Sequence, residues 1–480
     1  MAIEPGKHSF LTGRRIAGTG EASLATSETA MAADDPRQVL GNRPMTFQQY
    51  AVVAICVLVN MIDGYDILAI SLAGASLREA WSLTDGALGT LLAMHLVGMA
   101  VGALAVSPVA DQYGRRPAIL TCLLLMSVGM AFAALSNGYY AMVGSRLLTG
   151  VGIGGMTSTV GMLALEYASF KRREFSAAVV ASAYPVGTMI GAAVAAGAMQ
   201  AYDWRAIFWV GAGLSGLLFP LAFLYLPDSL DFLLNRQPKG ALAKSNRVLR
   251  RMGIPEIAAL PPRPDGSKSA VLAEIRQPFH VKELLKLFLA HALNMFTWYF
   301  ILQWGPILVT EANGPATASA TYQNWFSIGG VIGGMTAGWF CGVVGVKRMM
   351  WSTMLAMAVL VALFGQFADD VNLLWIIAPF MGAALFGSAV ANWLTIAFAF
   401  PPQLRATGLG FATTAGRVGS VFGPMVGGIL LGTRESGQLA LGGASAPLSL
   451  TVGAVCLVMA VPAVLSALTF SRARRLEPGR

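Results

Sequence analysis

The chain has 480 residues, of which 55% are hydrophobic and only 12% are charged. A soluble domain typically needs about 25% charged residues to cover its surface, so this composition excludes an ordinary soluble protein and indicates a membrane protein. The formal net charge is +9. The basic residues occur in short stretches between apolar runs and form no single basic face, so the charge does not indicate binding to nucleic acid.

Apolar runs of about 20 residues, the length that a helix needs to cross a bilayer, recur from Phe47 almost to the C-terminus. They predict an all-α membrane protein with twelve transmembrane helices in two groups of six. The first group is expected at 47–73, 86–107, 117–135, 139–168, 174–199 and 205–226. The second group is expected at 286–310, 320–343, 349–367, 371–400, 406–431 and 447–470.

These helices divide the chain into five parts. Residues 1–46 contain scattered charges and no apolar core, which predicts a disordered cytoplasmic tail without a cleavable signal peptide. A six-helix half at 47–226 and another at 286–470 are joined by a basic, polar loop at 227–285, which we expect in the cytoplasm. Residues 471–480 form a short cytoplasmic tail.

The positions of lysine and arginine predict the orientation in the membrane. With a cytoplasmic N-terminus, only Arg78, Arg205 and Arg434 of the 33 basic residues fall in outside loops. Both termini are therefore expected in the cytoplasm. We expect a multi-pass protein of a bacterial inner membrane that lies in the lipid bilayer, functions as a monomer and binds no nucleic acid.

Four charged residues lie deep inside predicted helices, where each costs roughly 2.5–3.5 kcal/mol. Asp63 and Asp66 are three residues apart and so lie on roughly the same helical face, where burial and mutual repulsion favour protonation of one of them. This pair is the candidate proton-coupling site. Arg146 and Arg417 must face a partner or a wet cavity, and a guanidinium binds a carboxylate through two parallel hydrogen bonds. Arg417 is our first candidate to bind an anionic substrate.

Aromatic residues and histidines near these charges are further candidates. Tyr65, Trp298 and Tyr299 are positioned to contact an organic substrate, although aromatic residues in membrane helices are more often packing or interface anchors. His95 and His291 are each open to two interpretations, a proton relay or a histidine that is hydrogen-bonded to a neighbouring carbonyl. The sequence shows no metal-spaced cluster and no nucleophile with a base partner, so it does not indicate an enzyme or a metal site.

The loop after the second predicted helix reads SPVADQYGRR and contains Asp111, Gly114 and Arg115. The glycine permits a tight turn, Asp111 can accept hydrogen bonds at a helix N-terminus, and Arg115 can pair with a carboxylate. Glu166, at the end of the fourth predicted helix, is the natural partner for Arg115. We interpret these residues as a conformational latch that one state keeps and another breaks. A related stretch at 334–348 indicates an internal repeat.

This loop resembles the loop motif of the major facilitator superfamily, and the sequence GSRLLTGVG at 144–152 resembles its second motif. The sequence DGYD at 63–66 resembles the aromatic acid:proton symporter family, and the stretches 226–233, 298–306 and 405–424 agree with that family. The resemblance implies a major facilitator fold. It also implies that the following residues matter for transport: Asp63, Asp66, Asp111, Arg146, Glu166, Arg405 and Arg417. We expect Arg405, at the cytoplasmic start of its helix, to act at the end where the latch lies.

Together these features predict a secondary active transporter without a bound cofactor. We expect proton-coupled uptake of a small organic acid, an aromatic carboxylate of the benzoate type, by alternating access of the two halves. Two alternatives remain open at this stage. One is transport of a sugar acid, a polyol or another metabolite, because the segment after the sixth helix also resembles sugar porters. The other is a nontransporting membrane sensor of the same ligands.

Overall fold

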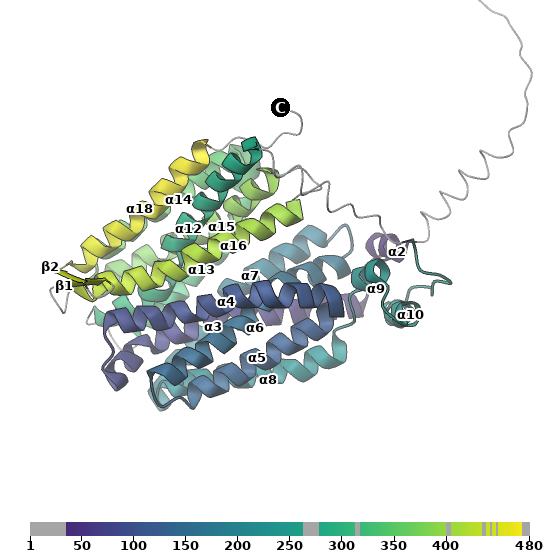
Figure 1. Cartoon of the computed structure of the whole chain (residues 1–480), viewed down its shortest axis with the longest axis horizontal. Coiled ribbons are helices and arrows are strands. Elements are labelled where there is room, and N and C mark those ends of the chain that lie inside the picture. Colours follow the sequence, from purple (N-terminus) through teal and green to yellow (C-terminus); the bar gives the residue numbers. More distant parts are fainter. Residues whose placement is uncertain are drawn as a thin grey trace, which may run out of the picture.

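The computed structural model describes residues 35–262, 278–312, 317–399, 405–433, 438–441, 444–447 and 450–472. Within these ranges, twelve helices are long and apolar enough to cross a membrane. They lie side by side in two groups of six (Figure 1). The number and grouping of the membrane helices predicted from the sequence are therefore confirmed.

The first group contains α3 (Phe47–Trp81), α4 (Asp85–Tyr113), α5 (Arg115–Ala134), α6 (Tyr139–Tyr167), α7 (Arg173–Ala201) and α8 (Arg205–Tyr225). The second group contains α12 (Pro278–Glu311), α13 (Ala318–Val344), α14 (Val346–Gln366), α15 (Val371–Ala399), α16 (Arg405–Leu431) and α18 (Val452–Arg472). Most ends lie within a few residues of their predicted positions, because apolar runs set the length of a membrane helix.

Three helix ends differ by six residues or more, and tertiary contacts explain one of them. Helix α4 continues six residues beyond the predicted end at 107, so residues 108–113 of the predicted loop are helical. Helix α3 continues eight residues beyond the predicted end at 73 and stops where Ser82 adopts a left-handed conformation with φ of 50°. The added turns contain a fully buried Leu77 and the ion-paired Arg78. Helix α12 begins eight residues before the predicted start at 286.

Short elements occupy both ends of the bundle. Helices α9 (Leu230–Arg236) and α10 (Ala241–Arg251) lie within the predicted polar loop, beside α2 (Pro36–Asn42) (Figure 1). Helix α2 falls within the segment 1–46, for which the sequence predicted a disordered tail, and its Gly41 carbonyl accepts a hydrogen bond from the Phe170 amide. At the opposite end, β1 (Gln438–Leu441) and β2 (Ala444–Pro447) form an antiparallel pair that was not predicted.

Glycines bring the second and fourth helices of each half into close contact. A Cβ atom on Gly154 of α6 would lie 2.0 Å from the Met99 carbonyl oxygen of α4, and one on Gly329 of α13 would lie 1.8 Å from the Pro379 carbonyl oxygen of α15. Small residues allow this close backbone approach in membrane helices, which pack without a hydrophobic driving force. The same packing in both halves supports the internal repeat predicted from the sequence.

The turns after the second helix of each half are also alike. Gly114 joins α4 to α5 with φ of 102°, and Gly345 joins α13 to α14 with φ of 94°. Side chains other than glycine rarely adopt this conformation. A Cβ on Gly114 would also lie 3.3 Å from the Phe232 ring of α9. The glycine of the loop motif is therefore explained by its backbone conformation and by the helix that covers it.

The two halves touch at the end of the bundle away from α9 and α10. Arg78 of α3 lies 2.8 Å from Glu311 of α12, and a Cβ on Gly89 of α4 would lie 2.8 Å from the Pro424 carbonyl oxygen of α16. Closer to the middle, the Ser71 hydroxyl donates to Gln303 over 2.5 Å.

Candidate functional site

A buried ion pair lies inside the first half. Arg146 Nη1 of α6 donates to Asp66 Oδ1 of α3 over 3.0 Å, and both side chains are 1% exposed or less. The same guanidinium lies 4.9 Å from the centre of the Phe208 ring and donates to Thr149. Arg146 is thus enclosed by residues of its own half. The structure pairs the proposed proton carrier Asp66 with the proposed substrate ligand Arg146, which leaves neither free in this state.

Asp63 and Arg417 lie on opposite halves and act on each other across the interface. The charge of Arg417 lies within electrostatic range of the Asp63 carboxyl group. Asp63 is 5% exposed, and its Oδ1 has no hydrogen-bond partner among the described residues. Arg417 is partly exposed and forms no ion pair within 4.0 Å with any described residue. Of the four intramembrane charges, Arg417 and Asp63 are therefore the two that remain available to bind a substrate and a proton.

The partners of Arg417 are neutral. Its Nη1 lies 3.5 Å from the Tyr299 hydroxyl of α12 and 3.6 Å from the Met99 sulfur of α4, while its Nε is buried without a partner in the described part of the chain. A guanidinium with weak, neutral contacts retains its capacity to bind an anion. Arg417 stays the first candidate to bind a carboxylate.

Aromatic rings from both halves gather beside these charges. Tyr184 of α7 lies 6.5 Å from Trp298 and 6.1 Å from Phe386 of α15, measured between ring centroids. Trp298 lies 4.8 Å from Tyr299 and 5.6 Å from Phe386. We call these four residues the ring cluster. Such separations are typical of favourable aromatic pairs, and the buried Tyr184 hydroxyl has no partner among the described residues.

Sequence reasoning identified only part of this cluster. It selected Trp298 and Tyr299, and the structure brings both together next to Arg417. It missed Tyr184 and Phe386, since an aromatic residue in an apolar helix carries no feature that separates binding from packing. Tyr65, selected as a substrate ligand, instead donates to the Ile207 carbonyl of α8 over 2.7 Å inside the first half. We therefore leave Tyr65 out of the candidate site.

The two membrane histidines differ in their surroundings. His291 of α12 hydrogen-bonds to the Asn392 side chain of α15. His95 of α4 is fully buried, and neither ring nitrogen has a partner among the described residues. A hydrogen bond from His95 to a neighbouring carbonyl, one of the two interpretations of this residue, is not present among the described residues.

The predicted partner of Arg115 is present at the end of the bundle that carries α9. Arg115 Nη1 lies 2.5 Å from Glu166 Oε2, and the Glu166 side chain is 4% exposed. Glu166 also accepts hydrogen bonds from the Ser229 hydroxyl and from the Asp231 amide, at the N-terminus of α9. Negative charge is favourable at a helix N-terminus. The ion pair is confirmed, and its role as a conformational latch stays a prediction.

Two further predicted residues have side chains outside the described part of the structure. Asp111 lies in the last turn of α4, and Arg405 begins α16. Arg434, predicted in an outside loop, also lies outside the described residues. Among the residues that are described, no group of three histidine, cysteine, aspartate or glutamate side chains is arranged to hold a metal ion.

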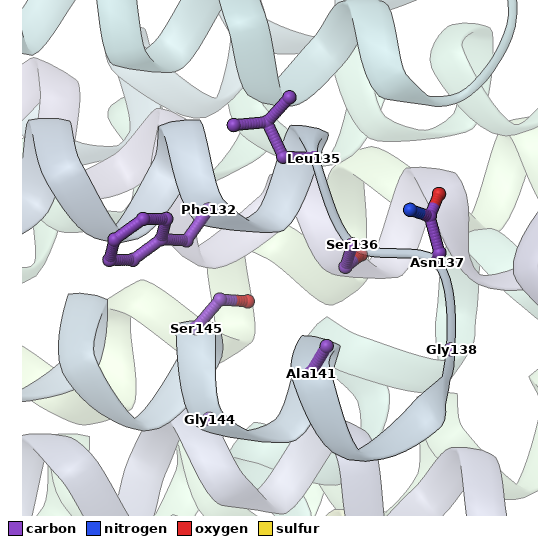
Figure 2. A pocket seen from close by; sticks show the side chains of 8 residues that line it. All are labelled: Phe132, Leu135, Ser136, Asn137, Gly138, Ala141, Gly144 and Ser145. Atoms are coloured by element: carbon purple, nitrogen blue, oxygen red, sulfur yellow. The ribbon is translucent and has the colours of Figure 1, made fainter.

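A separate open pocket lies at the turn between α5 and α6, away from the ring cluster. Figure 2 shows Phe132, Asn137 and Ser145 among the side chains that line it. All eight lining residues are uncharged, and Asn137 accepts a hydrogen bond from Arg205 over 3.4 Å. This pocket offers no fixed charge for an ionic ligand.

Comparisons with known proteins agree with the fold. The 4-hydroxybenzoate transporter PcaK of Acinetobacter baylyi is 27% identical over 427 residues, which cover 87% of this chain and 93% of that protein. The gallate transporter of Pseudomonas putida is 25% identical, with 83% and 89% covered. The xylose transporter XylE from E. coli, in a partially occluded inward open conformation, superposes with a TM-score of 0.69 at 16% identity, covering 91% of this chain and all of that one.

The family model of the Major Facilitator Superfamily matches residues 53–424, which reach from the first membrane helix to the eleventh. The match includes the intramembrane charges, the ring cluster and the loop with Gly114. The chain therefore belongs to the major facilitator superfamily and is a membrane transporter.

Proposed function

We propose that the protein imports an aromatic carboxylate together with a proton. One observation carries this proposal: Arg417 of the second half, which has no ion pair with a described residue, lies against Tyr299 of the ring cluster and within electrostatic range of the Asp63 carboxyl group of the first half. A carboxylate, an aromatic ring and a proton each have a complementary group there. The transporters of 4-hydroxybenzoate and gallate, which are similar along most of the chain, support this substrate class.

Arg417 is the carboxylate ligand in this proposal. It is partly exposed and carries no ion pair with a described residue, whereas Arg146 is fully buried and already bound to Asp66. A planar guanidinium in a low-dielectric site binds a carboxylate in a bidentate manner, which orients the ring attached to it. The ring then lies toward Trp298 and Tyr299, because Tyr299 contacts Arg417 directly.

The ring cluster supplies affinity for the aromatic part. Three of its members come from the second half and Tyr184 comes from the first, so a bound ring contacts both halves. A stacked or edge-on aromatic pair contributes about 0.5–1.5 kcal/mol beyond the burial of its area. Contact with both halves couples binding to their relative position, which an alternating-access transporter requires.

Asp63 carries the proton in this proposal. When it is ionised it satisfies the charge of Arg417 across the interface, and it competes with the substrate carboxylate for that charge. Protonation removes the competition, so substrate and proton are taken up together. Asp66 instead holds Arg146 in place inside the first half. The structure thereby suggests different roles for the two aspartates of the DGYD sequence.

The predicted orientation assigns the two ends of the bundle to the two sides of the membrane. The halves meet at the end that we expect to face the outside, through Arg78 and Glu311 and through Gly89 and Gly428. The Arg115 and Glu166 pair lies at the other end, which we expect in the cytoplasm. We propose that the two ends open in turn, with the Arg115 and Glu166 latch changing its contacts between the two states.

The test is uptake by proteoliposomes that contain the purified protein. Labelled benzoate, 4-hydroxybenzoate, a sugar acid and a polyol are supplied under an inside-alkaline pH gradient. Protein-free vesicles measure the passive entry of each weak acid. We expect gradient-dependent uptake of the aromatic acids above this background, and strong loss of uptake in Arg417→Lys at normal expression. Uptake of the sugar acid or polyol alone would contradict the proposed substrate class.

A further inference from the structure

We propose that His95 recognises a hydroxyl group on the ring of the substrate and so selects hydroxylated aromatic acids. This inference rests on the proposed function and adds a specificity-determining residue to the same site. It starts from the position of His95 on α4, from its unsatisfied ring nitrogens and from its charged neighbours.

His95 lies where α4 packs against Gly150 of α6 in its own half, and its neighbours on α4 contact the second half. Three residues before it, the Leu92 carbonyl accepts a hydrogen bond from Gln303 of α12. Four residues after it, the Met99 sulfur lies 3.6 Å from Arg417 of α16. Positions three and four residues apart share one face of a helix. His95 therefore lies one turn before Met99, whose side chain touches Arg417, and one turn after the Leu92 carbonyl that bonds to α12.

The imidazole of His95 is fully buried, and both of its nitrogens lack a hydrogen-bond partner among the described residues. Leaving a buried polar group unpaired costs about 1–3 kcal/mol, so such groups in native proteins call for an explanation. The other membrane histidine, His291, has a partner in Asn392. The difference singles out His95 as a group whose partner arrives with the ligand.

The charged groups around His95 define what that partner is. Arg146 of α6 and Arg417 of α16 both act on it electrostatically. The charge of Arg146 is balanced by Asp66, and in the proposed function the charge of Arg417 is balanced by the substrate carboxylate. The group that the substrate presents to His95 can therefore be neutral. A neutral imidazole has one donor and one acceptor nitrogen. A ring hydroxyl, which also donates and accepts, is the complementary neutral group on an aromatic acid.

The imidazole is fully buried in the state described here, and α4 and α16 pack closely more than one helical turn before it, at Gly89 and Gly428. Alternating access separates helices of the two halves. The hydroxyl therefore reaches His95 when α16 moves relative to α4, while the carboxylate stays on Arg417. A ligand without the hydroxyl leaves the imidazole unpaired, and this is the situation in which buried polar sites discriminate most strongly.

The experiment compares transport of benzoate with that of 3- and 4-hydroxybenzoate in proteoliposomes. For the unmodified protein we expect kcat/KM for at least one hydroxylated acid to exceed that for benzoate by about 10-fold, which corresponds to one buried hydrogen bond of about 1.4 kcal/mol. In His95→Leu this ratio falls to near 1, with benzoate uptake retained. The matched control His291→Gln changes a histidine that already has a partner, and it leaves the ratio unchanged.

The outcomes separate the two proposals. No carrier-dependent uptake of any aromatic acid by the unmodified protein would reject the proposed function itself. Uptake with the hydroxyl preference intact in His95→Leu would reject the role of His95 alone. If His95→Leu does not reach the membrane, His95→Gln decides, because it keeps a donor and an acceptor at a different reach. We then expect the ratio of 3- to 4-hydroxybenzoate transport to change at least 3-fold, and an unchanged ratio overturns the inference.

Discussion

Replacing Asp66 by asparagine tests whether the two aspartates of the first membrane helix have different roles. Asp66 and Arg146 form an ion pair at 3.0 Å in which both side chains are almost completely buried. Asp63, by contrast, forms no ion pair within 4.0 Å with any described residue, although each aspartate has one carboxylate oxygen without a hydrogen-bond partner there. We therefore expect Asp66→Asn to destabilise the protein, and Asp63→Asn to leave its stability almost unchanged.

The size of the effect follows from the burial of Arg146. The Asp66→Asn change leaves a guanidinium with 0% exposure and no counter-charge, although Thr149 and the Phe208 ring still contact it. Removing one partner of a buried ion pair costs about 3–5 kcal/mol. At 2–4 °C per kcal/mol this lowers the midpoint of thermal unfolding by roughly 10 °C. The double variant Asp66→Asn with Arg146→Met removes both charges and should recover most of that loss.

The assay is thermal unfolding of the purified variants in one detergent, followed by intrinsic fluorescence. Asp63→Asn is the matched control, since it makes the same chemical change one turn away on the same helix. An Asp66→Asn variant that unfolds at the same temperature as Asp63→Asn would refute the assignment of Asp66 to a structural pair. A double variant no more stable than Asp66→Asn would show that the uncompensated charge is not the cause.

Three further predictions address other contacts. Arg417→Lys should raise KM for an aromatic acid at least 10-fold while the charge is preserved, because the bidentate geometry is lost; an unchanged KM would remove Arg417 from the site. Glu166→Gln should increase amide hydrogen exchange in residues 228–236, because the carboxylate that holds Arg115 and the start of α9 loses its charge; unchanged protection would argue against this anchor. Glu311→Gln removes the ion pair that joins the halves at Arg78. A cysteine introduced near Arg78 should then react faster with an external thiol reagent, and equal labelling would show that other contacts close this end.

Much of the fold could be predicted from the sequence because the bilayer limits the choices. Each membrane helix needs about 20 apolar residues, so composition and run length gave the twelve helices and their two groups. The predicted end of α3 was wrong. Residues 74–81 are held in the helix by burial of Leu77 and by the ion pairs of Arg78, and neither contact can be recognised from an apolar run. The β1 and β2 pair was missed because its strands have only four residues each.

The sequence predicted the charged residues of the candidate site, but it did not predict which of them form pairs. An ionised residue in a membrane helix is costly, so Asp63, Asp66, Arg146 and Arg417 stood out at once. Their partners lie 80 or more positions away, and the sequence has no local feature that assigns Asp66 to Arg146. The partner of Arg115 was found because the loop motif and the end of the fourth helix meet at the same side of the membrane. Tyr184 was missed because only the folded arrangement brings it to Trp298.

The central claim, that Asp63 couples a proton to the movement of an aromatic acid, is tested most directly with Asp63→Asn in proteoliposomes. Two measurements are made on the same vesicles: accumulation of labelled substrate under a pH gradient, and exchange of labelled for unlabelled substrate without one, each corrected with protein-free vesicles. Asparagine keeps the size and hydrogen bonding of the side chain but fixes its charge at zero. We predict that the variant loses gradient-driven accumulation while it retains exchange, because a permanently neutral site still lets the loaded halves move. Accumulation against a substrate gradient at the unmodified rate would contradict the account.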